Sequence, residues 1–185
     1  MILIAAQQSG WTTAAIATIV AAAVSAIIAL LTLWVNGVRK ERSRRQQLYA
    51  DALAAVAAYR EFPYVIRRRR APAPGHEEIA GEERVRISEA LRQVQRDITS
   101  FSAWMKAEPT TDVSVKYDEL VSETRRVAGG YMHEAWKADP LDNDAGMNIP
   151  GVDYSSLAQY ETAYLDAVRG ALTFWRIAFP WFARS

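Results

Sequence analysis

The chain has 185 residues, no cysteine, and 22 Lys and Arg residues against 21 Asp and Glu residues, which leaves a formal net charge of +1. Without cysteine there is no disulfide, no thiol nucleophile and no thiolate-bound zinc or iron–sulfur centre. A charge this close to neutral also argues against a nucleic-acid-binding surface, so nucleic acid is not an expected partner.

The charges are unevenly distributed, because residues 1–38 contain no Asp, Glu, Lys or Arg. Residues 14–35 are all apolar or small except Thr18, Ser25 and Thr32, whose hydroxyls can bond to carbonyls of their own helix. A helix over this stretch is about 33 Å long, enough for a hydrocarbon core of about 30 Å. Trp11 and Trp34 flank it, where indole rings favour the two interfaces. We therefore predict that residues 1–38 hold one transmembrane anchor in a lipid bilayer.

The anchor is expected to be retained and oriented. A cleaved signal peptide needs a basic start and an apolar core of about 7–15 residues, whereas residues 1–13 lack a basic residue and the apolar stretch is longer. The positive-inside rule places the side that carries the following basic residues in the cytosol. Because the alanine- and arginine-rich composition is typical of high-GC bacteria, we expect a bacterial inner membrane, the N-terminus outside and residues 39–185 cytoplasmic. The basic residues are Arg39, Lys40, Arg42, Arg44 and Arg45.

Small residues recur every fourth position along the apolar stretch, at Ala17, Ala21, Ser25 and Ala29. This spacing lets two helix backbones approach closely, so it predicts a homo-oligomer or a protein partner in the membrane. The alternative is that an alanine-rich span produces the spacing by chance.

Prolines divide the remainder into segments of similar length near 39–62, 82–107, 112–136 and 154–179, because proline is excluded from helix interiors. We expect one long helix to leave the membrane and become the first helix of an all-α, up-down four-helix bundle over residues 39–185. The prolines are Pro63, Pro72, Pro74, Pro109, Pro140, Pro150 and Pro180.

Each segment has an apolar face at helical spacing. The first carries Leu48, Ala52, Ala55, Tyr59 and Phe62, and the second carries Ile87, Leu91, Val94, Ile98, Phe101 and Met105. The third carries Val113, Tyr117, Leu120, Thr124, Val127 and Tyr131, and the fourth carries Leu157, Tyr164, Val168, Leu172, Trp175 and Phe179.

Two local signals refine these boundaries. Gly129 and Gly130 predict that the third helix stops or kinks there. Ser156 and Gln159 have the spacing of a capping box, which predicts the start of the fourth helix.

Antiparallel neighbours place connections 63–81 and 137–153 together at the end of the bundle far from the membrane. The first contains four consecutive arginines, Arg67, Arg68, Arg69 and Arg70, and the second contains Asp139, Asp142, Asp144 and Asp153. Loops this long are uncommon unless functional or disordered. The two either latch onto each other or the arginines capture a phosphate-bearing partner.

Sequence patterns of known chemistry are missing. His76 and His133 lie in no zinc or di-iron motif, although the topology brings them near Glu134 and Asp139, and the stretch 142–146 only partly matches a calcium loop. We therefore predict no catalytic residue, no cofactor and no metal, and favour an interaction or scaffold protein. The alternatives are a tethered enzyme or ligand sensor with its site at the two connections, and an oligomerising membrane-perturbing effector.

The C-terminus is rich in aromatic residues, with Arg176 and Arg184 between them. The topology returns residues 174–185 to the membrane, where aromatic rings and arginine are favoured at the headgroup level. The alternative is that these rings pack on the end of the bundle, against Leu48 or Trp104. The aromatic residues are Phe174, Trp175, Phe179, Trp181 and Phe182.

Overall fold

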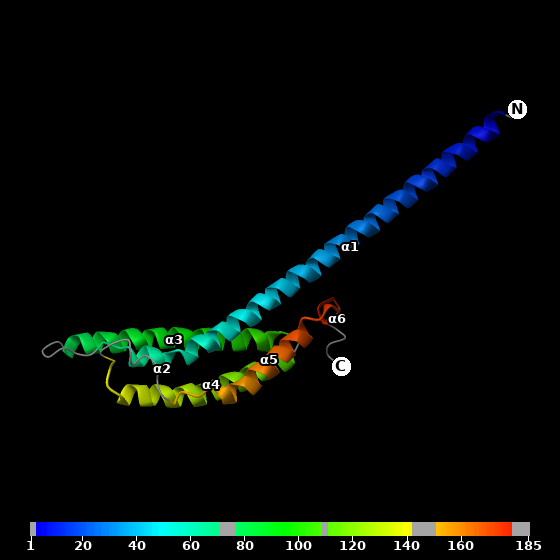
Figure 1. Cartoon of the computed structure of the whole chain (residues 1–185). Helices are drawn as coiled ribbons and strands as arrows, with labels where there is room; N and C mark the ends of the chain where they lie inside the picture. Colours follow the sequence, from blue (N-terminus) through cyan, green and yellow to red (C-terminus); the bar gives the residue numbers. More distant parts are fainter. Residues whose placement is uncertain (1–2, 71–76, 109–110, 142–150, 179–185) are drawn as a thin grey trace. The chain divides into compact units, whose positions relative to one another are not determined.

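A computed structural model of the chain describes residues 3–70, 77–108, 111–141 and 151–178, with side chains from residue 14 onward except at 77 and 111. The described residues are helical and contain no strand, which confirms the all-α class (Figure 1). The elements are α1 (Leu3–Arg60), α2 (Phe62–Arg67), α3 (Glu77–Ala107), α4 (Thr111–Lys137), the 3-10 turn η2 (Ser155–Leu157), α5 (Ala158–Ala171) and α6 (Phe174–Ala178).

The chain divides into two compact units, residues 1–43 and residues 44–185. Helix α1 belongs to both, since it runs without interruption for 58 residues, through Asn36 and Gly37. The expectation of one long helix that continues from the apolar stretch into the charged region is therefore confirmed.

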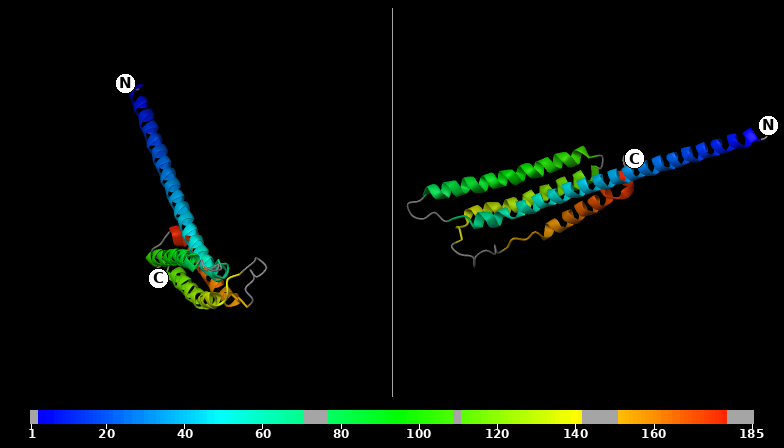
Figure 2. Two further views of the ribbon diagram at one scale, coloured as in Figure 1. Left: turned by 90° about the vertical axis from the view of Figure 1, so that its left-hand side faces the viewer. Right: turned by 90° about the horizontal axis from the view of Figure 1, so that it is seen from above.

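The second unit has one hydrophobic core, to which residues 44–60 of α1 and helices α2, α3, α4 and α5 all contribute (Figure 2). Helix α4 packs against α2, α3 and α5. The core residues with 2% or less of their surface exposed are Tyr49, Ala52, Val56, Ile66, Ile87, Ile98, Met105, Val113, Tyr117, Leu120, Ala128, Ala135, Tyr164 and Ala171.

Helix α3 confirms the predicted apolar face. Ile87, Ile98 and Met105 are buried, and Leu91 and Phe101 pack against the core while partly exposed. The charged positions between them are largely at the surface, as the helical period requires.

The buried face of α4 matches the predicted apolar face only in the first half of the helix. Val113, Tyr117, Leu120 and Thr124 are buried, but the buried line then moves to Ala128, Met132 and Ala135, while Val127 and Tyr131 are only half-buried. A straight helix drifts by about 20° per heptad from a strict seven-residue repeat, which accounts for the change of face. The helix also continues past Gly129 and Gly130 to Lys137, so of the two outcomes predicted there, a stop or a kink, the stop is wrong.

The single fourth helix predicted over 154–179 is wrong. Helix α5 ends at Ala171, and Thr173 then turns the chain, because its amide and hydroxyl both donate to the Gly170 carbonyl, at 3.3 and 2.9 Å. Leu157 and Tyr164 are buried as expected, whereas Trp175 is 71% exposed. Phe179 lies outside the described residues.

The predicted capping box at Ser156 is also wrong, since α5 has Leu157 as its N-cap and no side-chain cap. Asp153 organises this start instead. Its carboxylate accepts hydrogen bonds from the Ser155 amide at 2.8 Å and the Ser155 hydroxyl at 3.0 Å. The backbone bond from Ser155 is the largest cause of the lowered pKa of Asp153.

Pro63 explains the break between α1 and α2. It lacks an amide hydrogen, so it cannot continue the bonding of α1, but it is tolerated in the first turn of a new helix. The chain remains in the core across this break, with Phe62 and Ile66 buried.

Buried tyrosine hydroxyls connect the helices. Tyr117 donates to the Ala52 carbonyl at 3.2 Å, and Tyr164 donates to the Tyr49 carbonyl at 2.9 Å. Each phenol satisfies a polar atom inside the core and so fixes the register of α4 and α5 against α1. Burial raises the pKa of both phenols well above its ordinary value.

Candidate functional site

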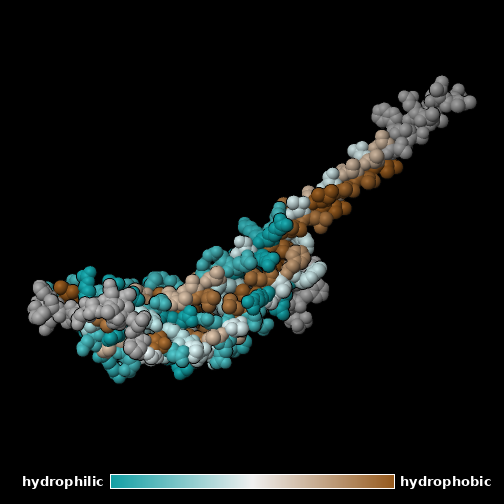
Figure 3. Space-filling model, viewed as in Figure 1, coloured by the Kyte–Doolittle hydropathy of each residue, from teal (hydrophilic) through white to brown (hydrophobic). Residues whose placement is uncertain are grey.

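The N-terminal part of α1 has an exposed apolar surface. Every residue from 14 to 34 is exposed, including Ile19 at 68% and Leu33 at 69%. Figure 3 shows the predominantly apolar surface of this part of the helix. Within the described residues, α1 is the helix that is long and apolar enough to cross a membrane. Trp34 is 40% exposed at one end of this surface, and the side chain of Trp11 lies outside the described residues.

The three hydroxyls of this stretch bond to their own helix, as predicted from the sequence. Satisfying a donor within the helix lowers the cost of placing it in an apolar medium. The small residues Ala17, Ala21, Ser25 and Ala29 are all exposed. The bonds run from Thr18 to the Ala14 carbonyl at 3.0 Å, from Ser25 to the Ala21 carbonyl at 2.8 Å, and from Thr32 to the Ile28 carbonyl at 2.8 Å.

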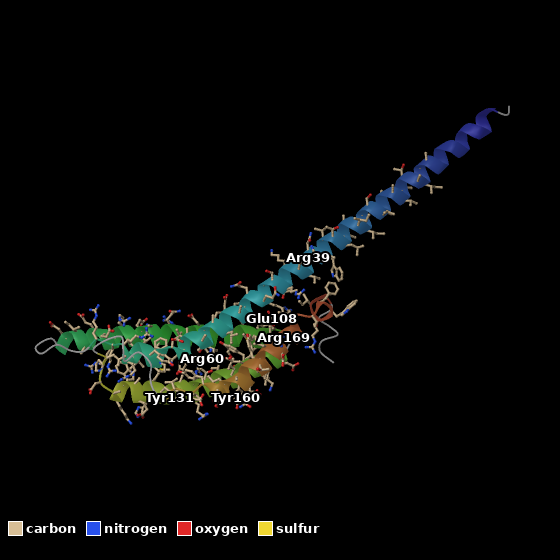
Figure 4. All side chains as sticks on the ribbon, viewed as in Figure 1. Arg39, Arg60, Glu108, Tyr131, Tyr160 and Arg169 are labelled. Carbon is tan, nitrogen blue, oxygen red and sulfur yellow. The ribbon has the colours of Figure 1, made fainter. Side chains whose placement is uncertain are left out.

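The basic cluster that follows has two parts. Arg39, Lys40 and Arg42 are exposed. Arg45 is buried, and its Nη2 lies 3.2 Å from Oε2 of Glu108, which Arg44 also contacts (Figure 4). The interpretation of all five residues as topology signals therefore overlooked a structural contact between α1 and the end of α3.

At the opposite end of the second unit, Arg69 binds the C-terminus of α4. Its guanidinium donates to the carbonyls of Ala135 at 2.9 Å, Trp136 at 3.3 Å and Ala138 at 2.6 Å. It also lies over the Trp136 ring, 5.2 Å from the centroid. A cation here satisfies carbonyls that the helix leaves unpaired and complements its dipole. Burial is the largest cause of the lowered pKa of Arg69, followed by the nearby Arg67 charge.

Arg67 extends the same contact, since its Nη1 donates to the Asp139 carbonyl at 2.6 Å and its own carbonyl accepts from the Leu141 amide at 3.1 Å. The predicted latch between the two connections therefore exists among the described residues, but it is made to backbone carbonyls. Asp142 and Asp144, which the charge argument relied on, lie outside the described residues. Arg68 donates to the Tyr64 carbonyl of its own helix at 3.2 Å.

A cleft of about 340 Å³ lies beside this latch. Arg84 enters it from α3, and its Nε donates to the Ala80 carbonyl at 3.2 Å. Glu83 accepts a bidentate pair from Arg86, at 2.8 and 2.7 Å, which is the largest cause of its lowered pKa. The cleft is thus predominantly basic and has one aromatic wall. Its lining residues are Arg69, Arg70, Ala80, Glu83, Arg84, Trp136 and Pro140.

The candidate metal ligands do not form a group in the part of the chain that the structure describes. His133 is exposed, Glu134 lies 3.5 Å from the Lys137 ammonium, and no three His, Asp or Glu side chains gather around a common point there. His76 and the calcium-like stretch 142–146 lie outside the described residues, as do residues 179–185 of the aromatic C-terminus.

No family model, no curated protein and no solved structure matches this chain.

Proposed function

We propose that this protein is a single-pass membrane protein in which the apolar part of α1 anchors a cytosolic four-helix bundle that binds protein partners. The observation that carries the proposal is the exposed surface of residues 14–34, which combines apolar side chains with internally bonded hydroxyls. At about 25 cal/mol per Å² of apolar area, a bilayer removes a large free-energy cost that water imposes on this surface. The exposed basic residues Arg39, Lys40 and Arg42 support a cytosolic second unit.

Contacts between helices support the bundle. Glu108 meets Arg45 at one end, and Arg70 and Glu83 line the same cleft at the other, so α3 runs antiparallel to residues 44–60 of α1. Helix α4 runs parallel to α1, because Tyr117 contacts Ala52 and the distal latch joins the C-terminus of α4 to the residues after α2. This alternation is that of an up-down bundle.

Helix α5 completes the alternation. Glu161 pairs with Arg60 and Tyr164 bonds Tyr49, so α5 runs antiparallel to α1. The Tyr154 hydroxyl donates to the Arg60 carbonyl at 2.9 Å, and its ring meets the Tyr131 ring edge to face at 5.7 Å (Figure 4). Desolvation raises the pKa of Tyr154 to about 12. These contacts hold the start of α5 near the end of α1.

The anchor is tested by alkaline extraction of membranes that contain the full chain. We expect the chain to stay with the lipid, and the double variant Ile27→Asp/Leu30→Lys to be released. Each charge near the helix centre costs about 2.5–3.5 kcal/mol of insertion free energy. The matched control, Ile27→Val/Leu30→Val, keeps the apolar surface and should be retained. Release of the unaltered chain would contradict the anchor.

Self-association is proposed as part of this function, through the exposed small residues Ala17, Ala21, Ser25 and Ala29. The Ser25 hydroxyl bonds to the Ala21 carbonyl of its own helix. The side chains on this face are small, so the backbone of a second helix can approach closely. Cross-linking in membranes should yield a dimer or higher oligomer that Ala21→Ile and Ser25→Ile abolish. Ile19→Val is the matched control and should leave it intact. Equal cross-linking in all variants would exclude this face as the site of self-association.

A second candidate function is capture of a small anionic ligand in the basic cleft, which would make the chain a tethered sensor or enzyme. The observation in its favour is that the cleft places Arg70 and Arg84 beside an aromatic wall. Calorimetric titration of the detergent-solubilised chain with inorganic pyrophosphate should show binding that Arg84→Ala weakens and Arg92→Ala, on the exposed side of α3, does not. Absence of heat with the unaltered chain would remove this candidate.

A further inference from the structure

Among the described residues of the second unit, most of the exposed aromatic side chains lie at one end. We call this the proximal end and define it by residues 44–48, 104–108, 112–115 and 171–178. Glu108 binds Arg44 and Arg45, which places the end of α3 beside the first residues of the unit. Helix α5 runs toward the same end, because Glu161 pairs with Arg60 and Tyr164, further along, bonds Tyr49.

Three large aromatic residues are exposed at the proximal end: Trp104 at 62%, Phe174 at 44% and Trp175 at 71%. Among the described residues of the second unit, the other exposed tryptophan is Trp136, at 36%, and it lies at the opposite end against Arg69. Exposed aromatic surface is therefore concentrated where α1 joins the unit.

Helix α6 buries its aliphatic side chains and exposes its aromatic ones. Ile177 and Ala178 are buried, whereas the two aromatic residues and Arg176 are exposed. The rings of Phe174 and Trp175 meet edge to face, with centroids 5.5 Å apart. A helix that served only to close the end of the core would turn its largest rings inward. Here the aliphatic side chains take that place and the rings with an arginine face outward.

The position of this end along α1 matches a membrane interface. Arg44 lies six positions after Val38, the last of the uncharged stretch, which is about 9 Å of helix. The headgroup region adds roughly 5–8 Å on each side of the hydrocarbon core. Tryptophan and arginine side chains extend several ångströms from their helices and favour this layer.

We propose that the proximal end of the second unit lies against the bilayer, with Trp175 and Phe174 in the headgroup layer as a second, non-spanning attachment. This inference rests on the proposed membrane anchor and adds the surface through which the bundle meets the lipid. Two attachments would restrict the tilt of the bundle relative to the bilayer more than one attachment does.

The test uses the full chain reconstituted in vesicles that contain brominated phosphatidylcholine, which quenches nearby tryptophan emission. Three variants each keep one of the six tryptophans and carry phenylalanine at the other five. The retained residue is Trp34, Trp136 or Trp175. We expect Trp175 emission to fall to a similar extent as that of Trp34, with stronger quenching by bromine near the headgroups, and Trp136 emission to stay unchanged.

The three reporters separate the two proposals. Quenching of Trp34 without quenching of Trp175 would leave the anchor in place and overturn the second attachment. No quenching of Trp34 would overturn the anchor itself. Where a five-fold replacement fails to fold by circular dichroism, the single variant Trp175→Phe serves instead. It should reduce the lipid-quenchable part of the emission, and an unchanged quenchable fraction would overturn the inference.

Discussion

Arg45 and Glu108 form an ion pair that is nearly closed to water, with Nη2 and Oε2 3.2 Å apart and side chains only 6% and 9% exposed. The pair joins the first residues of the second unit to the end of α3. Burying two charges is costly unless they remain paired, so such a contact specifies where helices meet more than it adds net stability.

Removing one residue of this ion pair should therefore destabilise the second unit strongly. We expect Glu108→Ala to lower the free energy of unfolding by about 3–5 kcal/mol, because Arg45 would keep its charge in the core without this carboxylate. Arg44→Ala should cost less than about 1 kcal/mol, since its side chain is 50% exposed. Thermal unfolding of both variants in detergent, followed by near-ultraviolet circular dichroism, measures the difference. Equal melting temperatures would contradict the buried pair.

The contacts of Arg69 with the end of α4 give a second prediction, that substitutions of two neighbouring arginines differ in their effect on stability. Arg69→Ala removes three charge-assisted bonds to the end of α4 and should destabilise the unit by about 1.5–3 kcal/mol. Arg68→Ala should have little effect, because among the described residues the Arg68 side chain bonds only to the Tyr64 carbonyl, one turn earlier in the chain. Hydrogen exchange is the sharper measurement, and faster exchange in residues 130–138 should accompany Arg69→Ala alone.

The core face of α3 gives a third prediction. Ile98→Asp should unfold the second unit, because it buries an unpaired carboxylate at a position only 2% exposed. Leu91→Asp should be milder, since Leu91 is partly exposed. Arg92→Asp and Arg96→Ala lie on the exposed side and should change the melting temperature little. A similar loss in all four variants would mean that this face is not buried.

Buried tyrosines predict a loss of stability at alkaline pH. Their folded pKa values lie above the ordinary value near 10, and that of Tyr154 is about 12. Below about pH 10 the phenols are neutral in both states and their contribution is fully present. Above it the unfolded chain releases protons that the folded chain retains, so stability falls until the folded pKa is passed. Denaturant titrations at about pH 8 and 11 should show this.

A matched pair of variants isolates the effect of one phenol. Tyr164→Phe should make the pH dependence shallower, because it removes one buried ionisable group, although it lowers stability at neutral pH through the lost bond to Tyr49. Tyr160→Phe, at a half-buried position of the same helix, controls for the change of residue. If both variants keep the full alkaline slope, the Tyr164 phenol is not its source.

The regular spacing of apolar residues in the sequence made much of the fold predictable. The buried positions Ile87 and Ile98 and the first half of α4 follow from spacing that places apolar side chains on one side of a helix. The continuous α1 follows from the absence of proline before Pro63. The burial of Arg45 could also have been predicted from helical spacing, but the charge of this residue argued against it. Positions 45, 49, 52, 56 and 59 form one buried line, and its first member was interpreted only as a topology signal because it is charged.

Other features depend on contacts that a sequence does not display. The carbonyls at the end of α4 that Arg69 binds have no residue-type signature, so the arginine run could be interpreted equally as a ligand site. The end of α5 at Ala171 is set by Thr173, whose hydroxyl competes for the Gly170 carbonyl, a weak local signal beside a strong apolar period. The exposed Trp175 follows from that break.

The most direct test of the central proposal, that α1 spans a membrane once, uses the absence of cysteine in the sequence. Single-cysteine variants Ser9→Cys and Ser100→Cys are treated with a membrane-impermeant maleimide in intact spheroplasts and again after lysis. We expect the cysteine at position 9 to react before lysis and the cysteine at position 100 only after it. If both positions react alike, they lie on the same side of the membrane, and a single-spanning α1 is contradicted.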